Sequence, residues 1–167
     1  LASLPQGALV TFDVVGVLFW PKDQIFIHNE KKEYKQYIAT LKKKYSNVKA
    51  NKLISIILKE RQVTLVDDNM PSLINSLQAR GVKTVALTSG YTGSFGKIKK
   101  REDLRIKTLK KLGIDFSSSF PDKQEFTLTE ESRSRATDAV SIFKQGVLFA
   151  SRNDKGQILK LFLEQFS

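Results

Sequence analysis

The sequence predicts an α/β fold in which helices cover both faces of a parallel sheet. Short apolar, β-branched runs at residues 8–12, 82–87 and 147–150 are typical of buried strands. They alternate with segments whose apolar residues recur at helical spacing, and this alternation favours a parallel sheet covered on both sides. The length of 167 residues fits one domain with one insertion.

A long basic segment, residues 30–60, is predicted to be helical. Tyr34, Ile38, Leu41 and Tyr45 follow one another at spacings of four, three and four, so they share one face of a helix. We interpret the accompanying lysines as a solvated helical face, with a phosphate- or membrane-facing surface as the alternative. These lysines are Lys31, Lys32, Lys35, Lys42, Lys43, Lys44, Lys49, Lys52 and Lys59.

Residues that start and end helices can be identified in most of the rest of the chain. Residues 116–143 are the exception, because they are rich in Ser and Thr and lack a clear hydrophobic periodicity. Candidate caps and stops are Asp68 or Asn69 before a helix over Pro71–Arg80, Gly81 after it, Gly113 after a helix over Arg101–Leu112, and Asp154 before a final helix. The final helix is predicted to place four residues inward: Ile158, Leu159, Phe162 and Leu163.

The net charge limits the kinds of partner. The chain has 28 Lys and Arg against 17 Asp and Glu, a balance of +11. This favours a phosphorylated small molecule, a phosphoprotein, an anionic membrane surface or nucleic acid. Specific nucleic-acid binding is not expected, because the sequence has neither zinc-finger spacing nor an RNA-recognition signature. Nonspecific, salt-dependent nucleic-acid binding stays a weaker alternative.

Cysteine content and hydropathy narrow the class of protein further. The sequence contains no Cys, which excludes disulfides, thiolate metal sites and Cys nucleophiles. No apolar stretch approaches the ~20 residues that a membrane span requires, so the sequence predicts a soluble protein. Because the chain begins with Leu1 rather than Met, we expect that its start was processed or trimmed. An export signal would then not be visible, and the compartment stays open.

Polar residues stand where the predicted strands end. Asp13 follows the first strand, Thr88 or Ser89 follows the second, and Lys155 opens the last helix. The carboxyl ends of parallel strands converge on one crevice. A carboxylate, a hydroxyl and an ammonium suit phosphoryl transfer, in which the carboxylate attacks phosphorus and the other two groups hold the phosphate oxygens. The alternative is that these residues only satisfy strand ends and turns.

These positions resemble the motifs of the haloacid dehalogenase-like (HAD) phosphatase superfamily. Its first motif, Asp-x-Asp-Gly-Thr/Val-Leu/Val, is similar to Asp13-Val-Val15-Gly16-Val17-Leu18. Its second and third motifs are similar to Thr84-Val-Ala-Leu-Thr88-Ser89-Gly90 and Asp154-Lys155-Gly156. The chain is most similar to a bacterial HAD-like family of poorly assigned function, over residues 71–88, 108–116, 146–150 and 154–156.

The resemblance implies a HAD-like, Rossmann-like core formed by residues 1–19 and 66–167, with residues 20–65 as a small helical cap over the site. It implies that Asp13 is the nucleophile, that Thr88 and Ser89 bind the phosphoryl group and that Lys155 positions both. It also implies Mg²⁺ as cofactor, held by the Asp13 carboxylate, the Val15 backbone carbonyl and a later acidic motif.

Two departures from the superfamily pattern lower the expected activity. Val15 replaces the Asp that protonates the leaving oxygen and then activates water, and such help is worth about 10²–10⁴-fold. The fourth motif, a strand ending in paired acids, would follow the last helix, but the sequence ends at Ser167. We therefore expect either a longer native protein or an incomplete Mg²⁺ site.

The retained motif residues and the two departures together leave two possible functions. The first is a Mg²⁺-dependent phosphomonoesterase with impaired turnover. The second is a catalytically inactive relative that binds an anionic or phosphorylated partner through its basic surface. Retention of Asp13, Thr88 and Lys155 supports the first, and Val15 supports the second.

Three further features have simpler interpretations. Val63–Asn69 is similar to the missing acidic motif, but it precedes the second motif in the sequence. We therefore interpret Asp67 and Asp68 as capping and turn residues. The alternative is that they bind a metal ion. His28, the only histidine, is predicted to be a surface residue rather than a base. The basic run Lys97–Arg101 is predicted to be a solvated loop, with guidance of an anion as the alternative.

Overall fold

Strands and helices alternate along the chain, as the sequence predicts. The computed structural model describes residues 4–5, 7–22, 32–123, 125–128 and 140–165. In chain order the elements are β1 (Leu9–Asp13), β2 (Phe19–Pro21), α2 (Lys32–Lys44), α3 (Asn47–Glu60), β3 (Val63–Leu65), α4 (Met70–Ala79), β4 (Lys83–Thr88), α5 (Arg101–Lys111), the short 3₁₀ helix η1 (Ser117–Ser119), β5 (Glu125–Leu128), β6 (Ser141–Lys144), β7 (Val147–Phe149) and α6 (Lys155–Glu164).

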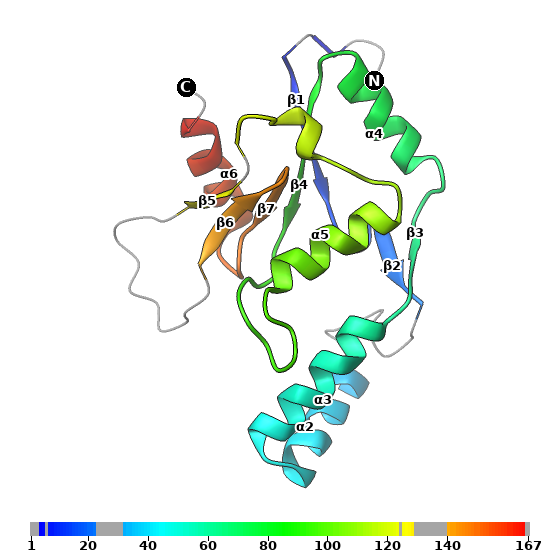
Figure 1. Ribbon diagram of the computed structural model, residues 1–167, viewed down its shortest axis with the longest axis vertical. Coiled ribbons are helices and arrows are strands. Elements are labelled where there is room, and N and C mark those ends of the chain that lie inside the picture. The colour runs from blue at the N-terminus through cyan, green and yellow to red at the C-terminus, as the bar shows by residue number, and fades with distance from the viewer. Residues whose placement is uncertain (1–3, 6, 23–31, 124, 129–139, 166–167) are drawn as a thin grey trace.

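A five-stranded sheet in the order β1-β4-β7-β6-β5 forms the centre of the molecule (Figure 1). β1, β4 and β7 are parallel neighbours, and the register aligns Asp13 with Leu87. One edge departs from the predicted parallel arrangement, because β6 runs antiparallel to both β7 and β5. The reason is a tight turn in which Gln145 and Gly146 both have positive φ, 46° and 79°, so the chain reverses without a crossover helix.

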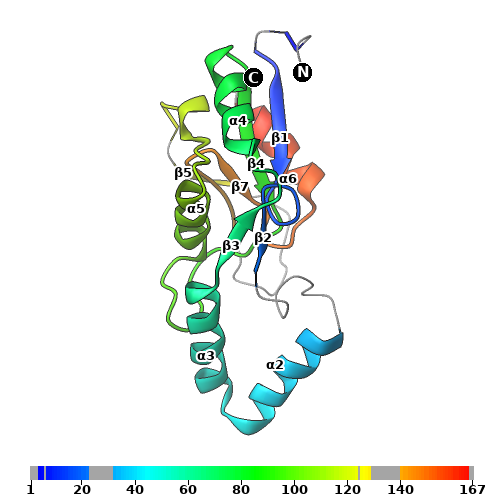
Figure 2. The same ribbon diagram turned by 90° about the vertical axis from the view of Figure 1, so that its right-hand side faces the viewer.

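Helices cover both faces of the sheet, which confirms that part of the predicted fold (Figure 1, Figure 2). On one face, α4 and α5 bury Ile74 and Leu109 in a hydrophobic core. On the other face, the ring of Phe162 in α6 stacks on Phe143 at 5.1 Å between centroids. The prediction that Leu163 lies inward was wrong: it is 45% exposed, at the edge of the buried stripe of α6.

α2 and α3 form a helical hairpin that extends away from the sheet, and the antiparallel β2–β3 ribbon joins the hairpin to the core (Figure 1, Figure 2). The predicted helical segment is therefore two helices, separated at Ser46, whose hydroxyl accepts a hydrogen bond from the N–H of Lys49 at 3.4 Å. Tyr34 and the three residues that share its predicted face are each partly buried. The lysines of α2 and α3 are exposed, as a solvated face requires.

The loop between β4 and α5 packs directly on α3. The buried Ser55 hydroxyl accepts a hydrogen bond from the N–H of Lys97 and donates one to the carbonyl of Lys52, both at 2.7 Å. Gly96 has φ +56°, and a Cβ on it would clash with Asn51 and Ser55. The backbone of the predicted solvated loop is therefore docked, while the side chain of Lys97 stays exposed.

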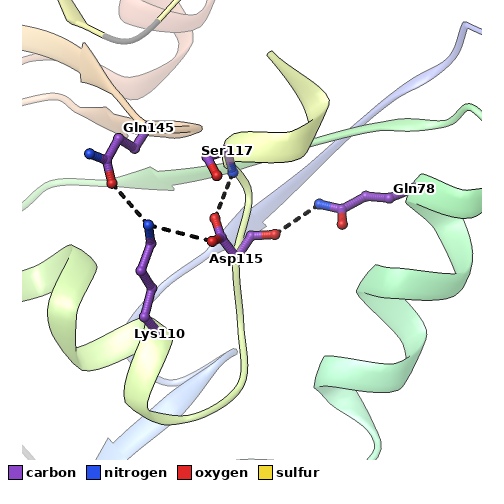
Figure 3. Close-up of polar contacts among 5 residues, drawn as sticks. All are labelled: Gln78, Lys110, Asp115, Ser117 and Gln145. Carbon is purple, nitrogen blue, oxygen red and sulfur yellow. Dashed lines mark hydrogen bonds and ion pairs between the residues drawn. The ribbon is translucent and has the colours of Figure 1, made fainter. Parts of the chain in front are cut away.

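A polar network fixes the loop that follows α5 (Figure 3). One carboxylate oxygen of Asp115 accepts the N–H of Ser117 at 2.9 Å, and the other lies 3.4 Å from the ammonium of Lys110. Lys110 also donates to Gln145 at 3.1 Å, and Gln78 donates to the backbone carbonyl of Asp115 at 3.0 Å. The network thereby connects α4, α5 and the β6–β7 turn.

Candidate functional site

β1 delivers Asp13 to the start of a tight turn. Gly16 has φ +92°, and its N–H donates to the carbonyl of Phe19 at 3.0 Å. A Cβ on Gly16 would lie 3.1 Å from the ring of Trp20, so glycine serves both the left-handed backbone and the close approach. The turn leaves the side chain of Asp13 47% exposed at the carboxyl end of β1.

Lys155 reaches Asp13 from the other end of the sequence. Its Nζ lies 2.8 Å from Oδ1 of Asp13, and the same oxygen accepts the N–H of Val14 at 2.7 Å. Asp154 caps α6 as predicted, because its carboxylate accepts the N–H of Gln157 at 2.8 Å. The structure therefore brings together two of the site residues that the sequence singled out.

The loop that carries Lys155 to this position has an unusual backbone. Ser151 and Arg152 have φ values of 47° and 67°, the left-handed region that non-glycine residues seldom adopt. The N–H of Ser151 donates to the carbonyl of Gly90, and that of Arg152 donates to the carbonyl of Ser89, both at 3.2 Å. Such strained positions occur preferentially at functional sites. The loop after β7 is thus held against the loop after β4.

Thr88 ends β4, one residue beyond the register partner of Asp13. Its side chain is buried, and its oxygen accepts the N–H of Gly90 at 3.2 Å, which leaves the hydroxyl proton for another acceptor. Ser89 is exposed. Among the described residues, no hydrogen bond joins Thr88 or Ser89 to Asp13 or Lys155. The predicted hydroxyl donors therefore lie at the same sheet edge without contacting the ion pair.

The described residues do not by themselves fit a magnesium site. Within the described ranges, no three His, Asp or Glu side chains gather closely enough to hold a metal ion. Oδ1 of Asp13 already contacts the ammonium of Lys155, and the side chain of Val15 packs against the hydrophobic core. A hard cation prefers several oxygen ligands. Mg²⁺ held by Asp13 and the Val15 carbonyl stays a prediction.

Arg105 of α5 is a member of this region that the sequence analysis missed. Its guanidinium lies 5.1 Å from the ring centroid of Phe19, the residue that closes the turn after Asp13. Its Nη1 is buried and has no hydrogen-bond partner in the described structure. The sequence contains only a weak signal, since Arg105 stands between the apolar residues Leu104 and Ile106, which also fits an ordinary surface arginine.

One positive and one negative side chain act on Arg105. The pKa of Arg105 is lowered to about 9, mainly by burial and then by the charge of Arg61, while Asp13 raises it. Arg105 is therefore a cation at neutral pH. Burial also raises the pKa of Tyr34 in α2, and Arg61 opposes that shift. Arg61, the residue that follows α3, is therefore near enough to Tyr34 and Arg105 to act on the pKa of both.

The candidate acidic motif at residues 63–69 forms a turn. Oδ1 of Asp67 accepts both the backbone N–H and the side-chain amide of Asn69, at 2.8 and 3.1 Å, which confirms the predicted turn role. Asn69 occupies the N-cap position of α4 without a capping side-chain bond, and Asp68 is exposed. His28 lies outside the described residues.

The basic run before α5 has a structural role at its end. The guanidinium of Arg101 donates to the carbonyls of Thr92 and Gly93, so it fixes the loop after β4. Burial lowers the pKa of Arg101, and Glu102 and Tyr91 oppose the shift.

None of the described helices combines the length and hydropathy that crossing a bilayer requires.

The chain is similar to proteins of Rickettsia species. It is 28% identical to an uncharacterized protein of Rickettsia bellii (strain RML369-C) over 167 residues, which cover 98% of this chain and 56% of the relative. It is 27% identical to an uncharacterized protein of Rickettsia prowazekii (strain Madrid E) over 169 residues, which cover 98% of this chain and 58% of the relative. The chain therefore spans a little over half the length of these curated relatives.

No solved structure matches the chain. A family model matches residues 1–167, so the chain belongs to the family described as "Protein of unknown function (DUF2608)".

Proposed function

We propose that the edge of the sheet at Asp13 is a HAD-like phosphoryl-transfer site with impaired turnover of phosphomonoesters. The observation that carries the proposal is the 2.8 Å contact between Asp13 and Lys155, made where β1 ends and α6 begins. A carboxylate and an ammonium at the carboxyl edge of parallel strands suit a nucleophile and a phosphate-binding cation. The α2–α3 hairpin is then the cap that the resemblance implies.

In this phosphoryl transfer, Asp13, Lys155 and Thr88 have separate roles. Oδ2 of Asp13 has no hydrogen-bond partner among the described residues, so it is the oxygen that attacks phosphorus. A bond forms between Oδ2 and phosphorus while the ester P–O bond breaks, and Lys155 and Thr88 hold the non-bridging oxygens. The leaving oxygen takes a proton from water, because Val15 carries no acid. Water then hydrolyses the acyl phosphate and restores Asp13.

The test is hydrolysis of p-nitrophenyl phosphate by the longest native form of the protein, with Mg²⁺ in the buffer. Asp13→Asn is the matched control, since it keeps the size of the side chain and removes the nucleophile. We expect slow turnover that Asp13→Asn abolishes. Turnover that is equal in both proteins would contradict the proposal, because it would come from a contaminant or from another site.

A binding protein is the second candidate function, and one observation favours it. Val15 packs against the core where an acid would be needed, and the described residues include no metal-binding acidic group. In that case the site binds a phosphorylated small molecule or a phosphoprotein without hydrolysing it. The exposed lysines of α2 and α3 then contact this partner or an anionic membrane surface. Absence of hydrolysis together with tight binding of phenyl phosphate would favour this candidate.

A further inference from the structure

We infer that Arg105 is a ligand-binding residue of the Asp13 site, and that it takes an anionic oxygen of a phosphorylated ligand without the help of a divalent metal. This inference rests on the proposed function, since it assigns the second cation for the same phosphoryl group. The sequence positions of Asp13, Thr88 and Lys155 point to a site, whereas only the surroundings of Arg105 point to its role in that site.

The position of Arg105 is set by the turn that carries Asp13. The guanidinium lies 5.1 Å from the ring centroid of Phe19, and Phe19 is fully buried. The backbone of Phe19 accepts the N–H of Gly16 and donates to the carbonyl of Val14 at 3.2 Å, so this ring is fixed relative to β1. A cation–aromatic contact on a fixed ring holds Arg105 beside the same turn.

The hydrogen-bonding state of Arg105 points to a missing acceptor. Its Nη1 is enclosed by protein and has no partner within the described part of the chain. Buried donors in folded proteins are nearly always paired, and an exception calls for an explanation. A guanidinium presents its donors as a planar fork that matches the oxygens of phosphate. A bound phosphoryl group would supply the acceptor that the described residues do not.

The charges near Arg105 lead to the same conclusion. The two acids of α5 are engaged elsewhere: Glu102 accepts the N–H of Gly93 at 2.8 Å, and Asp103 lies 2.8 Å from Lys144. Asp13 is already paired with Lys155. Arg105 therefore adds positive charge that no described carboxylate contacts directly.

This excess of positive charge replaces part of what a metal ion would provide. A phosphomonoester carries close to two negative charges at neutral pH. Lys155 at 2.8 Å from Asp13 and Arg105 beside Phe19 supply two positive charges to a region with the single carboxylate of Asp13. A site of this composition attracts the dianion by charge alone, and its affinity is expected to fall as salt is added.

The test is calorimetric titration of the protein with phenyl phosphate, in EDTA and again in Mg²⁺, at constant ionic strength. Arg105→Gln is expected to weaken binding about tenfold or more, which is the loss of one charge-assisted contact. Arg105→Lys keeps the charge but loses the fork, so it is expected to retain part of the affinity. Lys107→Gln is the matched control, because it removes one positive charge from an exposed position on the same helix.

The outcomes separate the inference from the function on which it rests. Weakening by Arg105→Gln but not by Lys107→Gln, in EDTA as in Mg²⁺, would support the inference. Weakening by Lys155→Gln with no change in Arg105→Gln would overturn it and leave the proposed function standing, as would binding that EDTA abolishes. Failure of the wild-type protein to bind phenyl phosphate in either buffer would overturn both.

Folding is checked for each variant by thermal unfolding. If Arg105→Gln does not fold, Arg105→Lys decides the question. A loss of affinity in folded Arg105→Lys supports the inference, and full affinity overturns it.

Discussion

Asp13 and Asp115 both pair with a lysine, yet the two regions differ in how completely their polar groups are satisfied. Asp115 uses both carboxylate oxygens, one for the N–H of Ser117 and one for Lys110, in a network that extends to α4 and the β6–β7 turn (Figure 3). Asp13 uses Oδ1 alone among the described residues, and the nearby Arg105 has a buried N–H group without an acceptor.

The difference indicates what each region is for. A network in which every group has a partner contributes to folding and leaves nothing for a ligand. A region with an open carboxylate oxygen and unpaired positive charge forgoes some stability and keeps contacts available. The same type of ion pair therefore has a structural role at Asp115 and a proposed functional role at Asp13.

The largest expected effect comes from adding the acid that the Asp13 site lacks. Val15→Asp should raise phosphatase turnover by about 10²–10⁴-fold, the usual worth of general acid–base help. Val15→Asn is the matched control, because Asn has nearly the same shape as Asp but carries no titratable group. The measurement is steady-state hydrolysis of p-nitrophenyl phosphate in Mg²⁺. A folded, Mg²⁺-bound Val15→Asp protein with no gain over Val15→Asn would count against this account of the missing activity.

On the structural side, Gly146→Ala should lower the free energy of unfolding by about 3 kcal/mol. Gly146 has φ +79°, and a Cβ on it would clash with the backbone of Phe116 beside the Asp115 network. Gly113→Ala is the control, since Gly113 has φ +77° and a Cβ there would meet only Pro71 at 3.6 Å. Urea unfolding should show a much smaller loss for Gly113→Ala, about 1 kcal/mol. Equal losses would mean that the backbone angle, rather than the clash, decides the cost.

A pair of substitutions to methionine compares the two regions directly. Arg105→Met should raise the free energy of unfolding by about 1 kcal/mol, because it removes a buried Nη1 that has no hydrogen-bond partner among the described residues. Lys144→Met should lower it by about the same amount, because Lys144 lies 2.8 Å from both Asp103 and Glu125. Urea unfolding followed by circular dichroism measures both. A large loss of stability in Arg105→Met would place Arg105 among the structural residues.

The sequence was most informative where local chemistry sets the structure. Asp13 follows an apolar strand and Lys155 follows a capping Asp154, so both positions, and their meeting at one sheet edge, could be predicted from strand-end logic. The reversal before β7 could not, because Gln145 stands in a left-handed turn position that usually holds Asn, Asp or Gly.

Arg105 could not be placed from the sequence for a different reason. Its environment is made by Phe19 and by the turn after Asp13, more than 80 residues earlier in the chain. Periodicity marks it only as a charged residue beside an apolar helix face, a pattern that also fits an ordinary surface arginine. Contacts between segments so far apart are decided by tertiary packing.

The smallest expected effect tests whether the Asp115 network acts on stability alone. Burial would raise the pKa of Asp115, but hydrogen bonds from Ser117 and the ammonium of Lys110 outweigh it, so the pKa is lowered. A carboxyl whose folded-state pKa is lowered contributes stability above its unfolded pKa, and this contribution is lost as the pH falls through the folded value. Asp115→Asn should therefore cost about 0.5–1 kcal/mol at pH 7, a modest figure because the pair is half exposed, and the difference from wild type should shrink below about pH 4.

Urea unfolding at pH 7, 5 and 3 measures this difference, and Asp122→Asn, at an exposed position outside the network, is the control. Affinity for phenyl phosphate should be unchanged in Asp115→Asn, because the carboxylate of Asp115 has no contact with the Asp13 site. A difference from wild type that persists at pH 3 would assign the cost to side-chain shape instead of charge. If folded Asp115→Asn bound phenyl phosphate more weakly than wild type, the two regions would be coupled, and Asp115 would not have a purely structural role.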